Sequence, residues 1–286
     1  MTETEQWTDR AVSAEEAVAL IKPGMNVFVH GAAATPTPML DAMVARGSLS
    51  GVKLFHFHLE GRCAFADPDC ASRFRSDSFF TGPALRKPIE EGRADFTPVF
   101  LSDVPRLFSQ GRIRLDAVIL QLSPPDRHGY CTLGTSVDAA LAASRSARVV
   151  IAEINEQMPR THGNTLVPFS RLDAFIHTNR PLPSHPPATP TEAESHIGSH
   201  IAPLVPDGAT LQMGIGAIPD AVLSRLMDKL DLGVHTEMFS DRVIDLVDAG
   251  VITNRRKKVH PGRITTSFVV GSQRAYDFVN DNPFVE

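Results

Sequence analysis

The sequence predicts an α/β protein with two similar open parallel-sheet domains, the second of them incomplete. Helical and strand patterns alternate along the 286 residues, as in proteins whose strands are joined by crossover helices. Several predicted strands are apolar at every position, which is typical of strands buried on both faces of a parallel sheet. A pattern near the N-terminus also recurs after a Pro-rich stretch in the second half of the chain.

The first predicted helix, residues 14–21, begins with a capping box. The Ser13 hydroxyl can accept a hydrogen bond from the Glu16 N–H, and the Glu16 carboxylate can reach back to the Ser13 N–H. The helix ends before the turn Pro23-Gly24. The next elements are expected to be a strand, a glycine turn and a helix, at 25–30, 31 and 38–45.

Four more strands are expected before the Pro-rich stretch, with helices among them. Residues 117–120 and 149–152 are continuously apolar, so the strands that contain them should lie inside a parallel sheet. The strands are expected near 52–59, 97–101, 115–121 and 148–154, and the helices near 84–91 and 136–145.

The Pro-rich stretch, residues 181–190, separates two predicted domains. It holds five prolines in ten positions, so it can continue neither a helix nor a central strand. We interpret it as an interdomain linker. The predicted domains are residues 1–180 and residues 191–286, and the second begins with a helix near 192–204.

The internal repeat relates the starts of the two domains. Residues 207–214 resemble residues 23–31, so that Gly31 corresponds to Gly214 at an offset of 183 positions. A chance match is the alternative. If the repeat is real, the second copy ends well before the length of the first, and we expect the sequence to be part of a longer protein. The incomplete sheet would then have an exposed edge that needs a partner.

The charge balance argues against a nucleic-acid partner. The net charge is −5, whereas a nucleic-acid-binding domain has a clustered basic face. The one basic run, residues 255–258, is interpreted as a solvated loop. The alternative is that it steers an anion, such as the phosphates of a nucleotide-like ligand.

The sequence also shows neither a membrane-spanning segment nor a secretion signal. No run approaches the roughly 18 apolar residues of a membrane-spanning helix. The polar, acidic segment from Met1 to Asp9 is unlike a signal or transit peptide. Cys63, Cys70 and Cys131 are too few for a disulfide framework. We therefore expect a cytoplasmic protein.

A glycine turn in the second domain is the first candidate binding site. Its residues are Gly214, Ile215, Gly216, Ala217 and Ile218. The turn follows a predicted strand and opens a helix expected over 219–229, with a proline at its first position. Free N–H groups at such a helix start can bind an anion. A purely structural turn is equally consistent with this short motif, which is not the dinucleotide fingerprint.

Glu237 is the candidate catalytic residue. It lies near the end of a predicted strand, and loops at the carboxyl ends of parallel strands are where α/β proteins bind ligands. The matching part of the first copy, residues 53–56, has no carboxylate. That asymmetry suggests a function for Glu237. Asp241 is better interpreted as a partner of the next helix dipole.

Two other clusters are interpreted as structural. His56 and His58 lie near Cys63 and Cys70, but the spacing fits no common zinc motif, so no metal is expected. Ser, Asp and His occur close together within residues 123–129. Members of a catalytic triad normally come from separate elements, so a Pro-rich loop is the simpler interpretation.

These motifs together resemble the acetyl-CoA hydrolase/transferase family, and within it the 4-hydroxybutyrate CoA-transferase branch. The likeness covers the chain from about Val12 to Glu286. The segments that carry it are 79–83 with 86–87, 123–129, 158–160, 211–222, 235–241, 261–262 and 277–278.

The resemblance implies two α/β domains with the active site between them, and Glu237 as the nucleophile. In the implied ping-pong mechanism, Glu237 attacks an acyl-CoA thioester, an acyl-glutamyl anhydride forms, and the CoA thiolate converts it to a glutamyl-CoA thioester. The 214–218 turn would contact CoA, which is a substrate, and no cofactor is implied. The expected substrates are acetyl-CoA and a short carboxylate such as 4-hydroxybutyrate or butyrate. The expected oligomer is a homodimer.

Two departures from the family pattern bear on these expectations. A further Gly-rich loop that the family has after the glutamate is missing here, which puts the activity of this chain alone in doubt. Arg242 stands where the family usually has Gly, and a positive φ there would cost about 1 kcal/mol. The alternatives to a transferase are an acyl-CoA hydrolase and a non-catalytic CoA-binding fragment.

Overall fold

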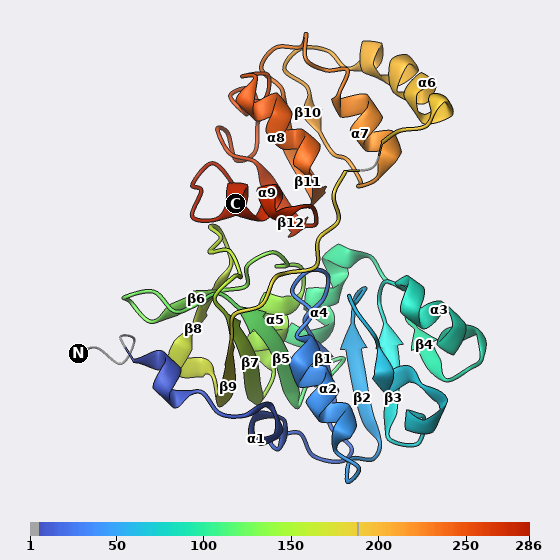
Figure 1. The fold of residues 1–286 in the computed structure, drawn as a ribbon, viewed down its shortest axis with the longest axis vertical. Coiled ribbons are helices and arrows are strands. Elements are labelled where there is room, and N and C mark those ends of the chain that lie inside the picture. The colour runs from blue at the N-terminus through green and yellow to red at the C-terminus, as the bar shows by residue number, and fades with distance from the viewer. Residues whose placement is uncertain (1–5, 188) are drawn as a thin grey trace. The chain divides into compact units, whose positions relative to one another are not determined.

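The protein is described here by a computed structural model that covers residues 6–187 and 189–286 (Figure 1). Residues 1–5, at the start of the predicted first domain and its acidic N-terminus, and Ala188, in the predicted linker, lie outside the described residues. The chain forms two compact units. The first unit runs to Arg160 and resumes over Thr165–Leu182, and the second comprises Thr161–Asn164 and Pro183–Glu286.

The first unit is built on a sheet of seven strands in the order β4-β3-β2-β1-β5-β7-β9. All neighbouring strands in this sheet are parallel. The chain builds the sheet outward from β1 to one edge and then returns to the other side of β1 with β5, which makes a doubly wound topology. The strands are β1 (Asn26–Val29), β2 (Val52–His56), β3 (Phe74–Ser78), β4 (Ala94–Phe96), β5 (Ala117–Leu122), β7 (Val149–Asn155) and β9 (Ala174–Thr178).

Short helices and a small antiparallel sheet complete the first unit. The α-helices are α1 (Ala14–Val18), α2 (Thr37–Ala45), α3 (Pro83–Glu90), α4 (Val104–Ser109) and α5 (Ala140–Ser146). The antiparallel pair is β6 (Tyr130–Thr132) and β8 (Leu166–Pro168). Short 3₁₀ helices lie at Trp7–Arg10, Ala64–Ala66, Pro68–Cys70, Leu101–Asp103 and Phe169–Arg171.

Two apolar clusters lie on opposite faces of the seven-stranded sheet. On β1, Val27 and Val29 belong to one cluster and Phe28 to the other. On β5, Ile119 belongs to the first cluster, while its neighbours Val118 and Leu120 belong to the second. Successive side chains of a strand point to opposite faces. The prediction that continuously apolar strands are buried on both faces is therefore confirmed.

The predicted capping box is present, and the helix that it starts is shorter than expected. The Ser13 Oγ accepts from the Glu16 N–H at 3.2 Å, and the Ser13 N–H donates to Glu16 Oε2 at 2.9 Å. Helix α1 ends at Val18 rather than at residue 21. The Ile21 N–H donates to the Val18 carbonyl at 3.0 Å, so the chain tightens into turns there.

The expected strand at 97–101 is wrong, because β4 ends at Phe96. Strand β3 was not predicted, since its sequence is polar. Its Asp77 is nevertheless buried, because Lys53 pairs with it at 2.9 Å and the Thr97 hydroxyl donates to it at 2.7 Å. Partners from β2 and from the residue that follows β4 therefore allow a polar strand inside this sheet.

The second unit has a smaller parallel sheet in the order β10-β11-β12. With the large sheet of the first unit, it confirms the predicted α/β class with two open parallel sheets. The strands are β10 (Thr210–Leu211), β11 (Gly233–Phe239) and β12 (Thr265–Val269). The helices are α6 (Glu192–Ile201), α7 (Ala217–Leu223), α8 (Asp241–Asp248) and α9 (Gln273–Val279), with a 3₁₀ helix at Ala202–Leu204.

The Pro-rich stretch has no helix or strand in its described residues. Part of it is bonded to the second unit. The His185 N–H donates to the Gly271 carbonyl at 2.9 Å, and the Tyr276 hydroxyl donates to the Pro183 carbonyl at 2.5 Å. Helix α6 then begins with a capping box of Thr191 and Glu194.

One part of the predicted solvated loop is wrong. Lys257, inside the basic run, is only 6% exposed. Its Nζ donates to the carbonyls of Val234 at 2.8 Å and Arg263 at 2.5 Å, and to Thr265 Oγ1 at 3.1 Å. Three oxygen acceptors satisfy the ammonium group, so its burial is tolerated. Burial lowers the pKa of Lys257, while Glu286 acts against that shift.

Candidate active site

The glycine turn and Glu237 are carried by neighbouring parallel strands. Strand β10 pairs with β11 through Thr210 with Gly233 and Leu211 with Val234. The turn follows β10, and Glu237 is the third residue from the end of β11. Carboxyl ends of parallel strands share one edge of a sheet. The fold therefore brings the two predicted site segments to the same edge.

Gly216 is the residue on which the turn's shape depends. Its φ is +110° and its ψ is −175°, a conformation that is essentially restricted to glycine. Gly214 has no positive φ, and a Cβ added there would meet nothing within 4 Å. Helix α7 begins at Ala217 instead of Pro219, so the proline is its third residue. The missing N–H still costs nothing, because the first four N–H groups of a helix have no intrahelical partner.

The turn is largely open to solvent. Gly214 and Gly216 are exposed, Ala217 is half-buried, and Ile215 and Ile218 are 42% and 41% exposed. Apolar side chains here stand beside the start of a helix, whose N–H groups favour an anion. A ligand with both apolar and anionic parts would therefore match the turn.

Glu237 is exposed on the face of β11 that also carries His235. Among the residues that the structure describes, none donates a hydrogen bond to its carboxylate. Its main-chain carbonyl is held, however, and accepts from Thr266 Oγ1 at 3.2 Å and Ser267 Oγ at 3.1 Å. The backbone is thus fixed while the carboxylate stays free to meet a ligand. The mechanism implied by the family resemblance would be helped by a carboxylate partly removed from water, whereas the Glu237 side chain is exposed in this structure.

Asp241 stabilises the starts of two helices. It is buried in the first turn of α8, where a carboxylate complements the helix dipole. It also accepts from the Ser272 N–H at 2.8 Å and from the Ser272 hydroxyl. Ser272 caps α9, so Asp241 joins the starts of two helices.

Arg242 adopts ordinary helical geometry as the second residue of α8. The backbone strain considered for this position is therefore absent. Its guanidinium lies 3.3 Å from Asp245, and its charge acts on the buried Asp220 of α7. Burial raises the pKa of Asp220. Arg242 opposes this shift, while Asp241 and Asp245 add to it.

Sequence reasoning did not single out Thr236 and Thr266, the hydroxyl residues that hold the backbone at this edge. Thr236 Oγ1 accepts from the Met213 N–H at 3.0 Å and lies 2.8 Å from the Met213 carbonyl. A threonine next to a candidate nucleophile in a strand is the only signal that the sequence offered.

The two clusters set aside in the first unit have structural roles. His56 is buried between the Phe57 carbonyl and Ser76 Oγ, and burial lowers its pKa to about 4. Burial also raises the pKa of the Cys63 thiol to about 12. In the described part of the chain, no group of three or more His, Cys, Asp or Glu side chains could hold a metal ion.

The 123–129 segment forms a loop that Asp126 organises. Asp126 Oδ1 accepts from the N–H groups of His128 and Tyr130, each at 2.9 Å. Its other oxygen pairs with Arg160 at 2.6 Å. Two of the segments that carry the family resemblance therefore meet in a structural ion pair.

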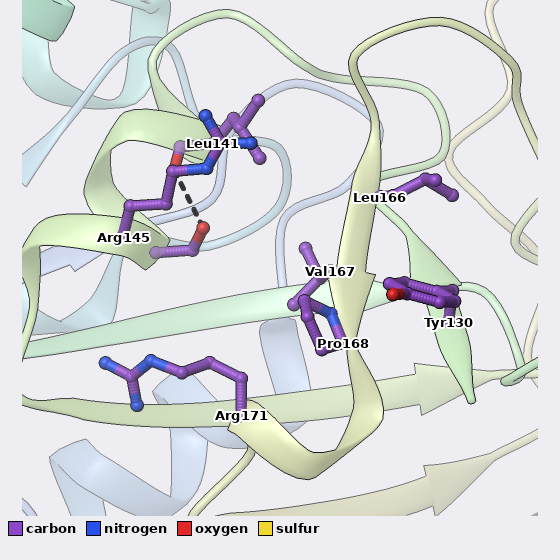
Figure 2. A pocket seen from close by; sticks show the side chains of 8 residues that line it. Tyr130, Leu141, Arg145, Leu166, Val167, Pro168 and Arg171 are labelled. Atoms are coloured by element: carbon purple, nitrogen blue, oxygen red, sulfur yellow. Dashed lines mark hydrogen bonds between the residues drawn. The ribbon is translucent and has the colours of Figure 1, made fainter. Parts of the chain in front are cut away.

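A pocket of about 400 Å³ lies elsewhere in the first unit (Figure 2). It is lined by Tyr130, Leu141, Ser144, Arg145, Leu166, Val167, Pro168 and Arg171, none of them a predicted site residue. In Figure 2 the Arg145 and Arg171 side chains do not converge on one point. Arg171 also donates to the Ala147 carbonyl and lies 3.5 Å from Asp173. The pocket therefore has no convergent anion site.

No helix among the described residues is long and apolar enough to cross a membrane.

Known proteins with similar sequences carry related names. Residues 1–183 match the family model of the acetyl-CoA hydrolase/transferase N-terminal domain. The chain is 47% identical over 280 residues to a succinyl-CoA:acetate/propanoyl-CoA:succinate CoA transferase of Fasciola hepatica, covering 96% of this chain and 58% of that protein. It is 41% identical over 283 residues to a 4-hydroxybutyrate coenzyme A transferase of Clostridium kluyveri, covering 99% of this chain and 66% of that protein.

Solved structures are similar over the same extent. RipA from Yersinia pestis has a TM-score of 0.92 and 32% identity, covering 99% of this chain and 69% of that one. A 4-hydroxybutyrate CoA-transferase from Porphyromonas gingivalis has a TM-score of 0.82 and 37% identity, covering 100% of this chain and 68% of that one. The chain thus spans less than two thirds of the length of the curated relatives it matches.

Proposed function

Because this chain belongs to the acetyl-CoA hydrolase/transferase family, we propose that it transfers coenzyme A from an acyl-CoA to a short-chain carboxylate, with Glu237 as the nucleophile. The curated relatives are named for transfers that involve acetate, propanoate, succinate and 4-hydroxybutyrate. Acetyl-CoA with an acceptor of that size is therefore the substrate pair that we propose.

The first half-reaction loads CoA onto the chain. A Glu237 carboxylate oxygen attacks the thioester carbonyl carbon, and the carbon–sulfur bond breaks to release the CoA thiolate. The product is a mixed anhydride between the acyl group and Glu237. The thiolate then attacks the Glu237 carbonyl of the anhydride and expels the acyl group as a free carboxylate, which leaves a glutamyl-CoA thioester.

The second half-reaction is the same sequence in reverse. The acceptor carboxylate attacks the glutamyl thioester, the thiolate leaves and then attacks the acceptor carbonyl of the new anhydride. Glu237 is regenerated as a carboxylate. Donor and acceptor use one site in turn, so ping-pong kinetics are expected.

One observation supports this proposal above the others. The glycine turn follows β10, and Glu237 lies near the end of the neighbouring parallel strand β11. Met213, just before the turn, is hydrogen-bonded to Thr236, just before Glu237. A CoA molecule on the turn would place its thioester near that sheet edge. The exposed turn and the exposed Glu237 are both accessible to a ligand of this size.

A hydrolase is the second candidate, and the exposure of Glu237 favours it. Water can reach an exposed glutamyl thioester and release free CoA, whereas a transferase must exclude water until the acceptor arrives. In the transferase, the desolvation of Glu237 would come from the bound substrates. The two reactions share their first half and differ only in the final acceptor.

The first test is the intact mass of the purified chain after incubation with acetyl-CoA. The expected result is an added mass of one CoA minus water, mapped by peptide analysis to Glu237. The matched control is Glu237→Gln, which keeps the shape of the side chain and replaces the nucleophilic carboxylate with a neutral amide. We expect labelling to fall by at least about 1,000-fold in this variant, as in other losses of a covalent nucleophile.

Two outcomes would contradict the proposal. An adduct that persists in Glu237→Gln would assign the nucleophile elsewhere. A folded chain that binds CoA and forms no adduct would favour a non-catalytic CoA-binding role. When the adduct forms, adding acetate, butyrate, succinate or 4-hydroxybutyrate separates the remaining candidates. A new acyl-CoA indicates a transferase, and free CoA alone indicates a hydrolase.

A further inference from the structure

We propose that Thr236 is a positioning residue, which holds the 214–218 turn in register with Glu237 through its side-chain hydroxyl. This inference rests on the proposed function, because it concerns the same two segments. Thr236 and Glu237 are successive residues of β11, so their side chains lie on opposite faces of the sheet. The Thr236 hydroxyl contacts the backbone of Met213 in the neighbouring segment.

The contacts of Thr236 carry the first step. Strand β10 ends at Leu211, so backbone pairing with β11 stops two residues before Met213. Beyond that point, the Thr236 hydroxyl supplies the hydrogen bonds between the two segments. It accepts from the Met213 N–H at 3.0 Å and can donate to the Met213 carbonyl at 2.8 Å. One side chain thus satisfies both backbone groups of the residue that precedes the turn.

The hydroxyl also limits how Met213 can move. It has one hydrogen to donate and two lone pairs to accept with. The Met238 carbonyl, at 3.1 Å, is the only other acceptor that competes for this hydrogen among the described residues. Thr236 is itself buried, which protects these bonds from water. Met213 is therefore fixed against β11 while Gly214 leaves the sheet.

A second threonine repeats the arrangement on the next strand. Thr266 lies beside Thr236 in the parallel register of β11 and β12. Its Oγ1 reaches the Glu237 carbonyl at 3.2 Å and the Phe268 carbonyl at 3.1 Å. Thr236 makes the corresponding pair of contacts one strand earlier, to Met213 and Met238. The two residues form a threonine pair that holds the turn and Glu237 at one level of the sheet.

The threonine pair differs from other threonine hydrogen bonds in the same unit. Thr253 Oγ1 donates to Asp231 at 2.8 Å, next to the opposite end of β11. Loss of that bond would lower stability without touching the turn. Thr253→Val is therefore a matched control for the removal of one threonine hydroxyl.

The first experiment measures amide hydrogen exchange of the intact chain. Thr236→Val keeps the shape of the side chain and removes the hydroxyl. We expect exchange of the Met213 amide and of the turn to become about tenfold faster, the effect expected from one lost hydrogen bond. Thr236→Ser should restore slow exchange, and Thr253→Val should leave the turn unchanged. Should Thr236→Val fail to fold, Thr236→Ala removes the same hydroxyl with a smaller side chain.

The second experiment measures the rate at which acetyl-CoA labels Glu237. We expect about a tenfold slower rate in Thr236→Val, recovery in Thr236→Ser, and a wild-type rate in Thr253→Val. Thr266→Val should have a smaller effect than Thr236→Val, because Ser267 still donates to the Glu237 carbonyl at 3.1 Å. If the substitutions acted only by unfolding the protein, the labelling rates of all four variants would fall in proportion to their losses of stability. The positioning role instead predicts that Thr253→Val and Thr236→Ser keep the wild-type rate.

The outcomes separate this inference from the proposed function. Unchanged exchange of the turn in Thr236→Val overturns the positioning role, whatever the labelling result. Faster exchange with a wild-type labelling rate also overturns it, because the turn would then not matter to Glu237. If the wild-type chain is not labelled at all, the proposed function fails. Exchange alone then decides whether Thr236 holds the turn.

Discussion

The turns that follow the first strand of each unit have similar sequences and different surroundings. Residues 31–36, after β1, are buried at every position. Residues 214–218, after β10, are mostly exposed. Gly31 in the first turn and Gly216 in the second are also needed for different reasons. A Cβ on Gly31 would come within 2.8 Å of the His58 carbonyl, whereas Gly216 has free space around it and a positive φ.

The first turn is enclosed by a buried polar network of its own unit. The Thr35 carbonyl accepts from Gln121 Nε2 at 3.1 Å and from Arg180 Nη2 at 3.0 Å. Arg180 also binds both oxygens of Glu153, at 2.6 and 2.9 Å. Asn155 completes the network with a hydrogen bond to Gln121 at 3.0 Å. Strands β5 and β7 and the segment after β9 therefore all contribute side chains to this network.

Among the residues that the structure describes, Thr236 is the one side chain that anchors the second turn at the strand end, through Met213. One pattern of strand, glycine turn and helix thus occurs in two different environments. In the seven-stranded sheet the turn becomes part of the interior. The N–H groups of Ala32, Ala34 and Thr35 donate to main-chain carbonyls, and the Thr35 carbonyl accepts from side chains. In the three-stranded sheet the turn remains open, and its N–H groups are available to a ligand.

The largest loss of stability is expected from a substitution that removes a partner of the first turn. In Arg180→Ala, the fully buried Glu153 loses its ion-pair partner. We expect the first unit to lose about 3–5 kcal/mol of stability, the usual effect of leaving a buried charge unpaired. The measurement is urea unfolding followed by the fluorescence of Trp7, which packs against Phe175 and His177 of that unit. A midpoint equal to that of the wild type would show that the network does not hold the turn.

Acid should act on the first unit through His56. Its folded pKa, about 4, lies below the ordinary value of 6.5, so between these values the unfolded chain binds more protons. Stability of the first unit is then fully present above about pH 6.5 and falls as the pH approaches 4, by about 3 kcal/mol in total. Trp7 fluorescence during urea unfolding at several pH values measures this. The control, His56→Gln, should flatten the profile.

The two glycines offer a matched pair of substitutions. Gly31→Ala should destabilise the first unit by about 1–3 kcal/mol, because the clash is with backbone that cannot easily move. It should leave Glu237 labelling at the wild-type rate. Gly216→Ala should cost a similar amount of backbone strain, about 1–3 kcal/mol, but release it by reshaping the exposed turn. We expect slower labelling there and little change in Trp7 unfolding. The reverse pattern would contradict the assignment of roles.

The smallest expected effect is an opposite response to pH in the second unit. The folded pKa of Asp220 is raised by burial, so its contribution is present at acid pH and is lost as the pH rises through that folded pKa. Burial disfavours the charged form of Asp220, and Asp220→Asn replaces this carboxylate with a neutral amide. The variant should therefore gain stability over the wild type as the pH rises above about 4, the ordinary aspartate value. Exchange of α7 amides against pH measures the difference, and parallel profiles for the two proteins would rule it out.

Features set by nearby residues were predictable from the sequence. The capping box of Ser13 and Glu16 depends on two residues three apart, and it is present. Strands β1, β5 and β7 were expected because each contains a run of apolar residues that is visible in the local sequence. The position of Glu237 near a strand end followed from the same pattern.

Features that depend on distant partners were not predictable. Strand β3 is polar, and Asp77 is buried there only because Lys53 and Thr97 reach it. Arg180 and Thr35 are 145 residues apart, and no local pattern links them. The threonine pair likewise depends on the register of β11 and β12, which a single sequence does not reveal.

The burial of Lys257 has a chemical consequence. Amine-acylating reagents need a neutral, accessible amino group. The exposed Lys258 offers such a group, whereas the three oxygen contacts of Lys257 withhold its amine. Two adjacent lysines should therefore react at very different rates. The ratio of their modification would report, from inside one peptide, how often the second unit opens.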